Sequence, residues 1–103
     1  MLATVFDVLA EPHRRRILDL LLVRERPVAE LVGALGLSQP GVSKHLRVLR
    51  EAGLVESTAD AQRRVYRLRP EGLVEIDEWL TPFRAAWRDR LDSLEQHLDA
   101  MPD

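Results

Sequence analysis

Apolar residues recur every three or four positions along most of the 103-residue chain, a spacing that predicts amphipathic helices. Pro12 suits the first turn of such a helix, because proline has no N–H to lose there. Gly36 and Gly53 follow two of the apolar stripes, where a left-handed residue would end a helix. The stripes of four predicted helices are Leu2, Val5, Phe6 and Leu9; Ile17, Leu18, Leu21 and Leu22; Val28, Leu31, Val32 and Leu35; and Val42, Leu46 and Leu49.

After Gly53 the pattern changes to two short segments typical of β-strands, Leu54 to Ser57 and Arg63 to Arg69. The polar stretch from Thr58 to Gln62 predicts the loop of a β-hairpin. Because an isolated hairpin is unstable, this one is expected to pack on the helices. Strand alternation places Tyr66 on the side away from Arg63, and we assign it to the core.

Beyond Pro70 the pattern is helical again to about residue 99. Pro82 interrupts this segment, and Thr81 before it suits an N-cap, so a kinked helix and two abutting helices both fit. The steps of three and four between apolar residues approach a heptad seam. The residues of this seam are Leu80, Phe83, Trp87, Leu91, Leu94 and Leu98.

Four helices, a hairpin and a long helix predict a mostly α protein with a small β-hairpin, an α+β fold. Two short helices joined by a tight turn over residues 28–52 are typical of a helix-turn-helix, and the hairpin at 54–69 makes it a winged helix. Residues 1–103 are expected to form a single domain with one core.

The pair Pro40-Gly41 lies where the fourth helix begins rather than where it ends. Ser38 is the expected N-cap, with its hydroxyl accepting a hydrogen bond from the Gly41 N–H. At about 100° per residue, the face opposite Val42 and Leu46 is exposed. The N-terminal part of that exposed face contains Gln39, Pro40, Ser43, Lys44 and Arg47.

These residue types are the ones that a DNA-recognition helix uses. Glutamine pairs with adenine, arginine or lysine pairs with guanine, and serine with exposed N–H groups holds phosphates. Arg63 and Arg64 near the hairpin tip are placed to reach a phosphate or the minor groove. The alternatives are an ordinary solvated helix face and charged residues that protect a strand edge.

The net charge of -2 is unevenly distributed along the chain. Residues 1–69 carry twelve Lys and Arg against eight acids, whereas residues 70–103 carry three Arg against nine acids. A basic part beside an acidic one indicates a nucleic-acid surface on the basic part.

Several functional classes find no support. The chain has no cysteine, which excludes disulfides, thiolate metal sites and cysteine nucleophiles. His13, His45 and His97 fall in three different helices without a ligand spacing, so no metal site and no cofactor are expected. Nothing places serine, histidine and acid side chains together, so the chain is not expected to be an enzyme. No apolar run approaches the roughly 18 residues of a membrane span, and no secretory signal is visible, which favours a cytoplasmic protein.

Three segments, Glu11 to Leu21, Val28 to Val55 and Arg63 to Leu68, together resemble the ArsR/SmtB winged-helix transcriptional regulators over roughly residues 3–80. The tail from Gly72 to Leu98 resembles a subgroup without a known metal role, the SdpR-like regulators. The resemblance implies a homodimeric repressor that binds double-stranded DNA at an inverted-repeat operator. It places the dimer contacts in the first and last helices, residues 1–10 and 71–99.

Carried over by position, the resemblance implies two sets of site residues. The DNA contacts are Ser38, Gln39, Pro40, Ser43, Lys44, Arg47, Arg63 and Arg64. The dimer interface is Leu2, Val5, Phe6, Leu9, Trp79, Phe83, Trp87, Leu91 and Leu94.

The chain departs from the metal-sensing members of this family. Ala29 to Leu35 contains no cysteine pair, and the last helix offers His97 alone, so no small-molecule or metal effector is identified. Two alternative functions remain. One is a protein-interaction module without operator binding, with Trp79, Phe83 and Trp87 as its working surface, and the other is a ligand sensor with a pocket at the dimer interface.

Overall fold

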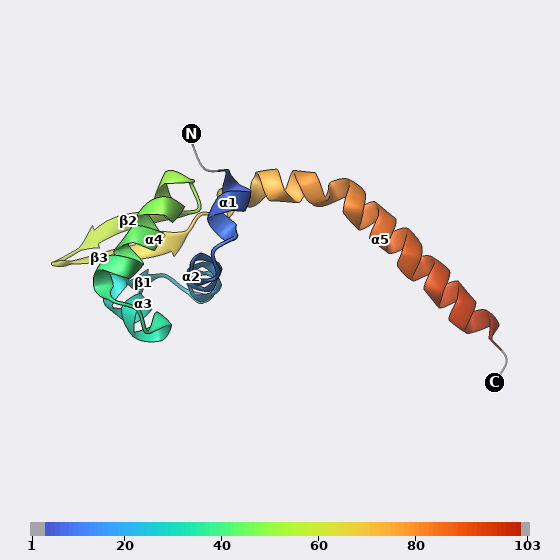
Figure 1. Ribbon diagram of the computed structural model, residues 1–103, viewed down its shortest axis with the longest axis horizontal. Helices are drawn as coiled ribbons and strands as arrows, with labels where there is room; N and C mark the ends of the chain where they lie inside the picture. Colours follow the sequence, from blue (N-terminus) through green and yellow to red (C-terminus); the bar gives the residue numbers. More distant parts are fainter. Residues whose placement is uncertain (1–3, 102–103) are drawn as a thin grey trace.

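The computed structural model describes residues 4–101 and shows a winged helix with one long helix at its C-terminal end (Figure 1). Its elements are α1 (Val5–Leu9), α2 (Pro12–Val23), β1 (Arg26–Pro27), α3 (Val28–Leu35), α4 (Gln39–Glu51), β2 (Val55–Asp60), β3 (Arg63–Leu68), the 3-10 helix η1 (Pro70–Leu73) and α5 (Val74–Ala100). The predicted fold class is confirmed. Within the described residues, no helix is long and apolar enough to cross a bilayer.

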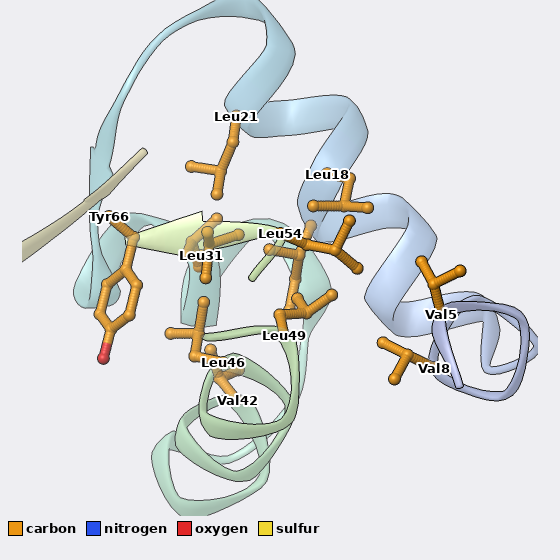
Figure 2. Packing of buried hydrophobic residues seen from close by; sticks show 12 residues of the cluster. Val5, Val8, Leu18, Leu21, Leu31, Val42, Leu46, Leu49, Leu54 and Tyr66 are labelled. Carbon is orange, nitrogen blue, oxygen red and sulfur yellow. The ribbon is translucent and has the colours of Figure 1, made fainter. Parts of the chain in front are cut away.

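One hydrophobic core joins α2, α3 and α4 to the sheet. Leu46 and Leu49 of α4 lie beside Leu31 of α3 and Leu54, which precedes β2 (Figure 2). All four side chains are inaccessible to solvent. Since α3 and α4 are both held by this core, the orientation of α4 is set by its buried side.

Two of the predicted apolar stripes were partly wrong. Leu22 is 72% exposed, while Leu20 packs against the core instead. The two residues lie on either side of the buried stripe of α2, so only tertiary packing decides which one is covered. In α1, Val5 and Val8 are buried and Phe6 is 40% exposed, and Leu2 lies outside the described residues.

The sheet is antiparallel, in the order β1-β3-β2. Strand β1 was not predicted, because its two residues are too few to show alternation; Pro27 is tolerated there because β1 is an edge strand. The predicted loop from Thr58 to Gln62 was wrong, since β2 continues to Asp60, which pairs with Arg63. Thr58 to Asp60 are exposed and polar, so no buried face reveals the strand.

Strand β3 lies between the other two strands, and the consecutive residues Val65 and Tyr66 are both 7% exposed. The assignment of Tyr66 to the core is confirmed. Alternation predicts that Val65 lies on the opposite side of the strand, together with Arg63. Because Val65 is buried too, both sides of β3 are covered at these two positions.

Helix α5 is continuous through Pro82 and bends along its first half (Figure 1). Thr81 is not an N-cap: its Oγ1 donates to the carbonyl of Asp77, 3.2 Å away. Such a back-bond and the missing proline N–H both bend helices, so the kinked helix is the alternative that forms. Because most of α5 projects from the body, the Cα radius of gyration is 18.9 Å, against about 13 Å for a compact domain of this length.

Gly72 marks a close approach between η1 and the end of α4. A β-carbon there would clash with the carbonyl group of Gly53 and would lie 2.9 Å from Leu54 Cδ2. Gly72→Ala is therefore expected to lower the free energy of unfolding by about 1–3 kcal/mol, since the backbone must shift to make room. Urea denaturation followed by circular dichroism measures this change.

Gly33→Ala is the matched control for that substitution. A β-carbon at Gly33 meets no atom within 4 Å, and alanine is the better helix former inside α3. This variant is expected to be as stable as the parent chain or more so. Equal stabilities of the two variants would contradict the close contact at Gly72.

Candidate nucleic-acid interface

The start of α4 has the geometry predicted for Pro40-Gly41. Ser38 Oγ accepts a hydrogen bond from the Gly41 N–H at 3.2 Å and caps the helix. Pro40 lies in the first turn, where its missing N–H leaves no helical bond unmade. A β-carbon at Gly41 would lie 3.3 Å from Ser38 Oγ, so the glycine also leaves room for the cap.

Helices α3 and α4 form the predicted helix-turn-helix, with a turn that depends on Gly36. This residue has a φ of 67° and ends α3, and Gly53 ends α4 with a φ of 77°. Both glycines end their helices in the left-handed conformation as predicted, Gly36 as the C-cap of α3 and Gly53 just after the C-cap Ala52 of α4. The buried side of α4 leaves five predicted recognition residues exposed or at the exposed start of the helix, namely Gln39, Pro40, Ser43, Lys44 and Arg47.

Three cations share the exposed side of α4. Lys44, Arg47 and Arg50 line a shallow hollow of about 380 Å³ together with Pro40, Ser43 and Tyr66. None of the three cations forms an ion pair with a carboxylate of residues 4–101. This face of α4 therefore presents positive charge that the chain itself does not neutralise.

Some arginines of the β2–β3 hairpin are paired with carboxylates of the chain, and one is placed to contact a ligand with its full charge. Arg67 pairs with Glu56 at the base of the hairpin. At the tip, Arg63 Nη2 lies 3.1 Å from Asp60 Oδ2, an exposed pair that contributes little energy and is easily exchanged. Arg64 donates to Ser57 Oγ at 3.1 Å and meets no carboxylate among the described residues. Of the two predicted wing residues, Arg64 thus has the more available charge.

Arg50 and Tyr66 are members of this surface that the sequence reasoning did not include. Arg50 follows Arg47 by three positions, a spacing that makes them neighbours on a helix and that was available as a signal. Tyr66 packs in the core, but its hydroxyl lies at the margin of the cluster (Figure 2) and the residue lines the hollow. Its place depends on how β3 packs against α4, which no local pattern encodes.

A second polar cluster joins the start of α2 to the inner side of α4. Glu11 Oε2 caps α2 by accepting from the Arg14 N–H at 3.1 Å, and Glu11 Oε1 lies 3.0 Å from His13 Nδ1. The ring of His45 stacks on that of His13 with centroids 5.7 Å apart, and its Nε2 is 3.9 Å from Glu11 Oε2. The search for ligand spacings along the sequence missed this pair because the fold alone brings the two helices together.

Arg14 completes this cluster. Its Nε donates to His45 Nδ1 at 3.3 Å, and its Nη1 donates to the carbonyl of Val8 at 3.2 Å. Burial lowers the pKa of His45, and the positive charges of Arg14 and Lys44 act in the same direction, while Glu11 opposes them. Burial by itself would raise the pKa of Glu11, but the hydrogen bonds from His13 and the Arg14 N–H outweigh it and lower that pKa.

An exposed apolar face follows the length of α5. The ring of Trp79 meets that of Phe6 edge-on with centroids 5.6 Å apart, and its centroid lies 4.7 Å from that of Phe83. More than half of the surface of each of these α5 residues is exposed: Trp79, Phe83, Trp87, Leu91, Leu94 and Leu98. A continuous apolar surface of this kind marks an interaction site.

The residues of α1 that were predicted to form the dimer interface are mostly packed in their own chain. Val5 is buried in the core of its own chain, and Leu9 packs against that core. Phe6 alone among the described members of this set is exposed next to α5.

The fold and the cationic face of α4 define a winged helix-turn-helix DNA-binding domain. Residues 11–57 match the family described as "Bacterial regulatory protein, arsR family". The chain is 43% identical to the arsenic resistance transcriptional regulator ArsR1 of Pseudomonas putida, over 76% of this chain and 70% of the relative. The chain therefore belongs to the ArsR family and is a DNA-binding transcriptional regulator.

Two further comparisons agree with this membership. The chain is 29% identical to the transcriptional repressor SdpR of Bacillus subtilis, over 77% of this chain and 88% of the relative. A solved structure of an ArsR-like transcriptional regulator from Rhodococcus sp. RHA1 is 31% identical, with a TM-score of 0.73 over 98% of this chain and 93% of that one. The resemblance stated from the sequence motifs is confirmed.

Proposed function

We propose that this chain is a homodimeric transcriptional repressor of the cytoplasm that binds an inverted-repeat operator with two copies of α4. The observation that carries the proposal is the exposed side of α4, on which Lys44, Arg47 and Arg50 have no carboxylate partner among the described residues. DNA phosphates are the polyanion that such a surface fits. Use as an interaction module without DNA leaves these charges unexplained.

Each protomer contacts DNA phosphates with one set of residues and base edges with another. Ser38, Lys44 and the N–H groups of the first turn of α4 hold phosphates, while Gln39, Ser43 and Arg47 enter the major groove toward base edges. Pro40 adds a small apolar surface beside them. Arg63 and Arg64 of the wing reach the flanking phosphates or the minor groove, with Arg63 exchanging Asp60 for a phosphate.

Two protomers associate through the apolar face of α5. The distal part of this helix projects beyond the body of its own chain, so a second copy is needed to cover it (Figure 1). Phe6 extends the same surface from α1, whereas Val5 acts through the core that positions α1. Most of the acidic residues of the C-terminal segment lie in α5, which leads away from α4 (Figure 1), and this explains how a chain of net charge -2 binds DNA.

Selection of genomic DNA tests this proposal. Fragments from the source genome are incubated with the purified full-length protein at physiological salt, and the retained fragments are sequenced. They are expected to share an inverted repeat whose half-site centres lie about 10–10.5 base pairs apart, one helical turn, because the two α4 helices enter successive major grooves. Retained fragments without a common repeat would contradict operator binding.

A further inference from the structure

The cluster of Glu11, His13 and His45 has no part in the DNA contacts proposed above. One potential ligand atom of each residue lies within 4.8 Å of those of the other two. The side chains are 31%, 44% and 17% exposed, in the same order, so solvent reaches the cluster although His45 is largely covered. Two helices contribute to it, α2 at its N-cap and α4 at its middle.

We propose that Glu11, His13 and His45 bind a divalent transition-metal ion of the class that prefers imidazole ligands, Zn²⁺ in the first place. Two imidazoles and one carboxylate are an established zinc ligand set that leaves the fourth position to water. This inference revises the sequence-based expectation of no metal site. It does not depend on the proposed function.

The distances suit such an ion. Zinc–ligand bonds of about 2.0–2.1 Å in a tetrahedron set the ligand atoms about 3.4 Å apart. Glu11 Oε1 lies 3.0 Å from His13 Nδ1, and Glu11 Oε2 lies 3.9 Å from His45 Nε2, so each carboxylate oxygen stands near that separation from a different histidine. The three ligand atoms lie within 4.8 Å of one another, so rotations of the partly exposed Glu11 and His13 side chains bring them around one ion.

Binding of a metal ion to His45 removes a hydrogen bond of Arg14. A metal on His45 Nε2 leaves the ring proton on Nδ1, which then no longer accepts a hydrogen bond from Arg14 Nε. Arg14 keeps its second hydrogen bond, to the carbonyl of Val8. The positive charge of its guanidinium also opposes the ion, and the site is therefore expected to bind it less tightly than a site without a nearby cation.

The ion would connect the start of α2 to the helix that carries Lys44 and Arg47. A ligand that binds only the folded chain raises its stability in proportion to the logarithm of ligand concentration. Zn²⁺ is therefore expected to raise the melting temperature, and to hold α4 more firmly on α2.

The test uses full-length protein without a histidine tag, titrated with ZnCl₂ in a calorimeter. The parent chain is expected to bind one ion per protomer, and His13→Ala at least about tenfold more weakly, since even second-sphere losses have effects of that size. His13 is partly exposed, and circular dichroism checks that the variant folds. His97→Ala is the matched control, because it removes the histidine outside the cluster and is expected to bind like the parent.

A second measurement identifies the ligands without a substitution. In a titration followed by the imidazole nitrogen signals in NMR, His13 and His45 are expected to shift together, with His97 unchanged. No zinc binding, equal affinity of His13→Ala and the parent, or loss of binding in His97→Ala would each overturn the proposal. None of these results alters the operator-binding proposal, which is tested with DNA.

Discussion

Arg47→Ala is expected to weaken operator binding by about 1–3 kcal/mol, roughly 5- to 150-fold in Kd. The guanidinium of Arg47 is exposed on α4 and has no acidic partner among residues 4–101, so the whole of its charge is available to a base edge or phosphate. Lys44→Ala is expected to weaken binding to all duplexes alike, as loss of a phosphate contact does. A mobility-shift titration with the selected operator measures both effects.

Arg24→Ala is the matched control, because it removes the same charge from an exposed arginine that is already paired with Glu30 at 2.9 Å. Its affinity for the operator is expected to equal that of the parent. Lys44 and Arg47 are exposed and do not belong to the core, so thermal unfolding of their variants is expected to be unchanged. Unchanged operator affinity in both α4 variants would show that this face does not read DNA.

Trp87→Ala is expected to weaken the homodimer by at least about 2 kcal/mol, roughly 30-fold in its dissociation constant. Trp87 lies midway along the apolar face of α5 and is 67% exposed in the single chain, so a partner has a large aromatic surface to cover. Sedimentation equilibrium over a range of protein concentrations measures the change.

Asp89→Ala serves as the control for Trp87→Ala. Two positions further on, Asp89 lies about 200° around α5, on the side away from the apolar face. The dimer of this variant is expected to match that of the parent. If Trp87→Ala also dimerises like the parent, the protomers associate through another surface.

Features that rest on local chemistry could be predicted from the sequence. Ser38, Pro40 and Gly41 specify where α4 begins, because capping and the missing proline N–H act within one turn. Gly36 and Gly53 end their helices for an equally local reason, a positive φ. The exposed face of α4 followed from the spacing of its buried residues.

Features that depend on contacts between distant segments could not be predicted in this way. Strand β1 exists because Arg26 and Pro27 pair with Tyr66 and Val65 of β3. The exposure of Leu22 and the position of Tyr66 beside α4 depend on how whole elements pack. The stacking of His13 on His45 belongs to the same group, which is why a search for ligand spacings overlooked it.

The salt dependence of operator affinity tests the central claim most directly, because a surface that neutralises phosphates releases counterions. Fluorescence anisotropy with the selected duplex gives the association constant at each salt concentration. If Lys44, Arg50, Arg63 and Arg64 of both protomers contact phosphates, the logarithm of this constant is expected to fall with the logarithm of salt concentration with a slope of about -7. A flat dependence, or the same affinity for a duplex of random sequence, would contradict the account.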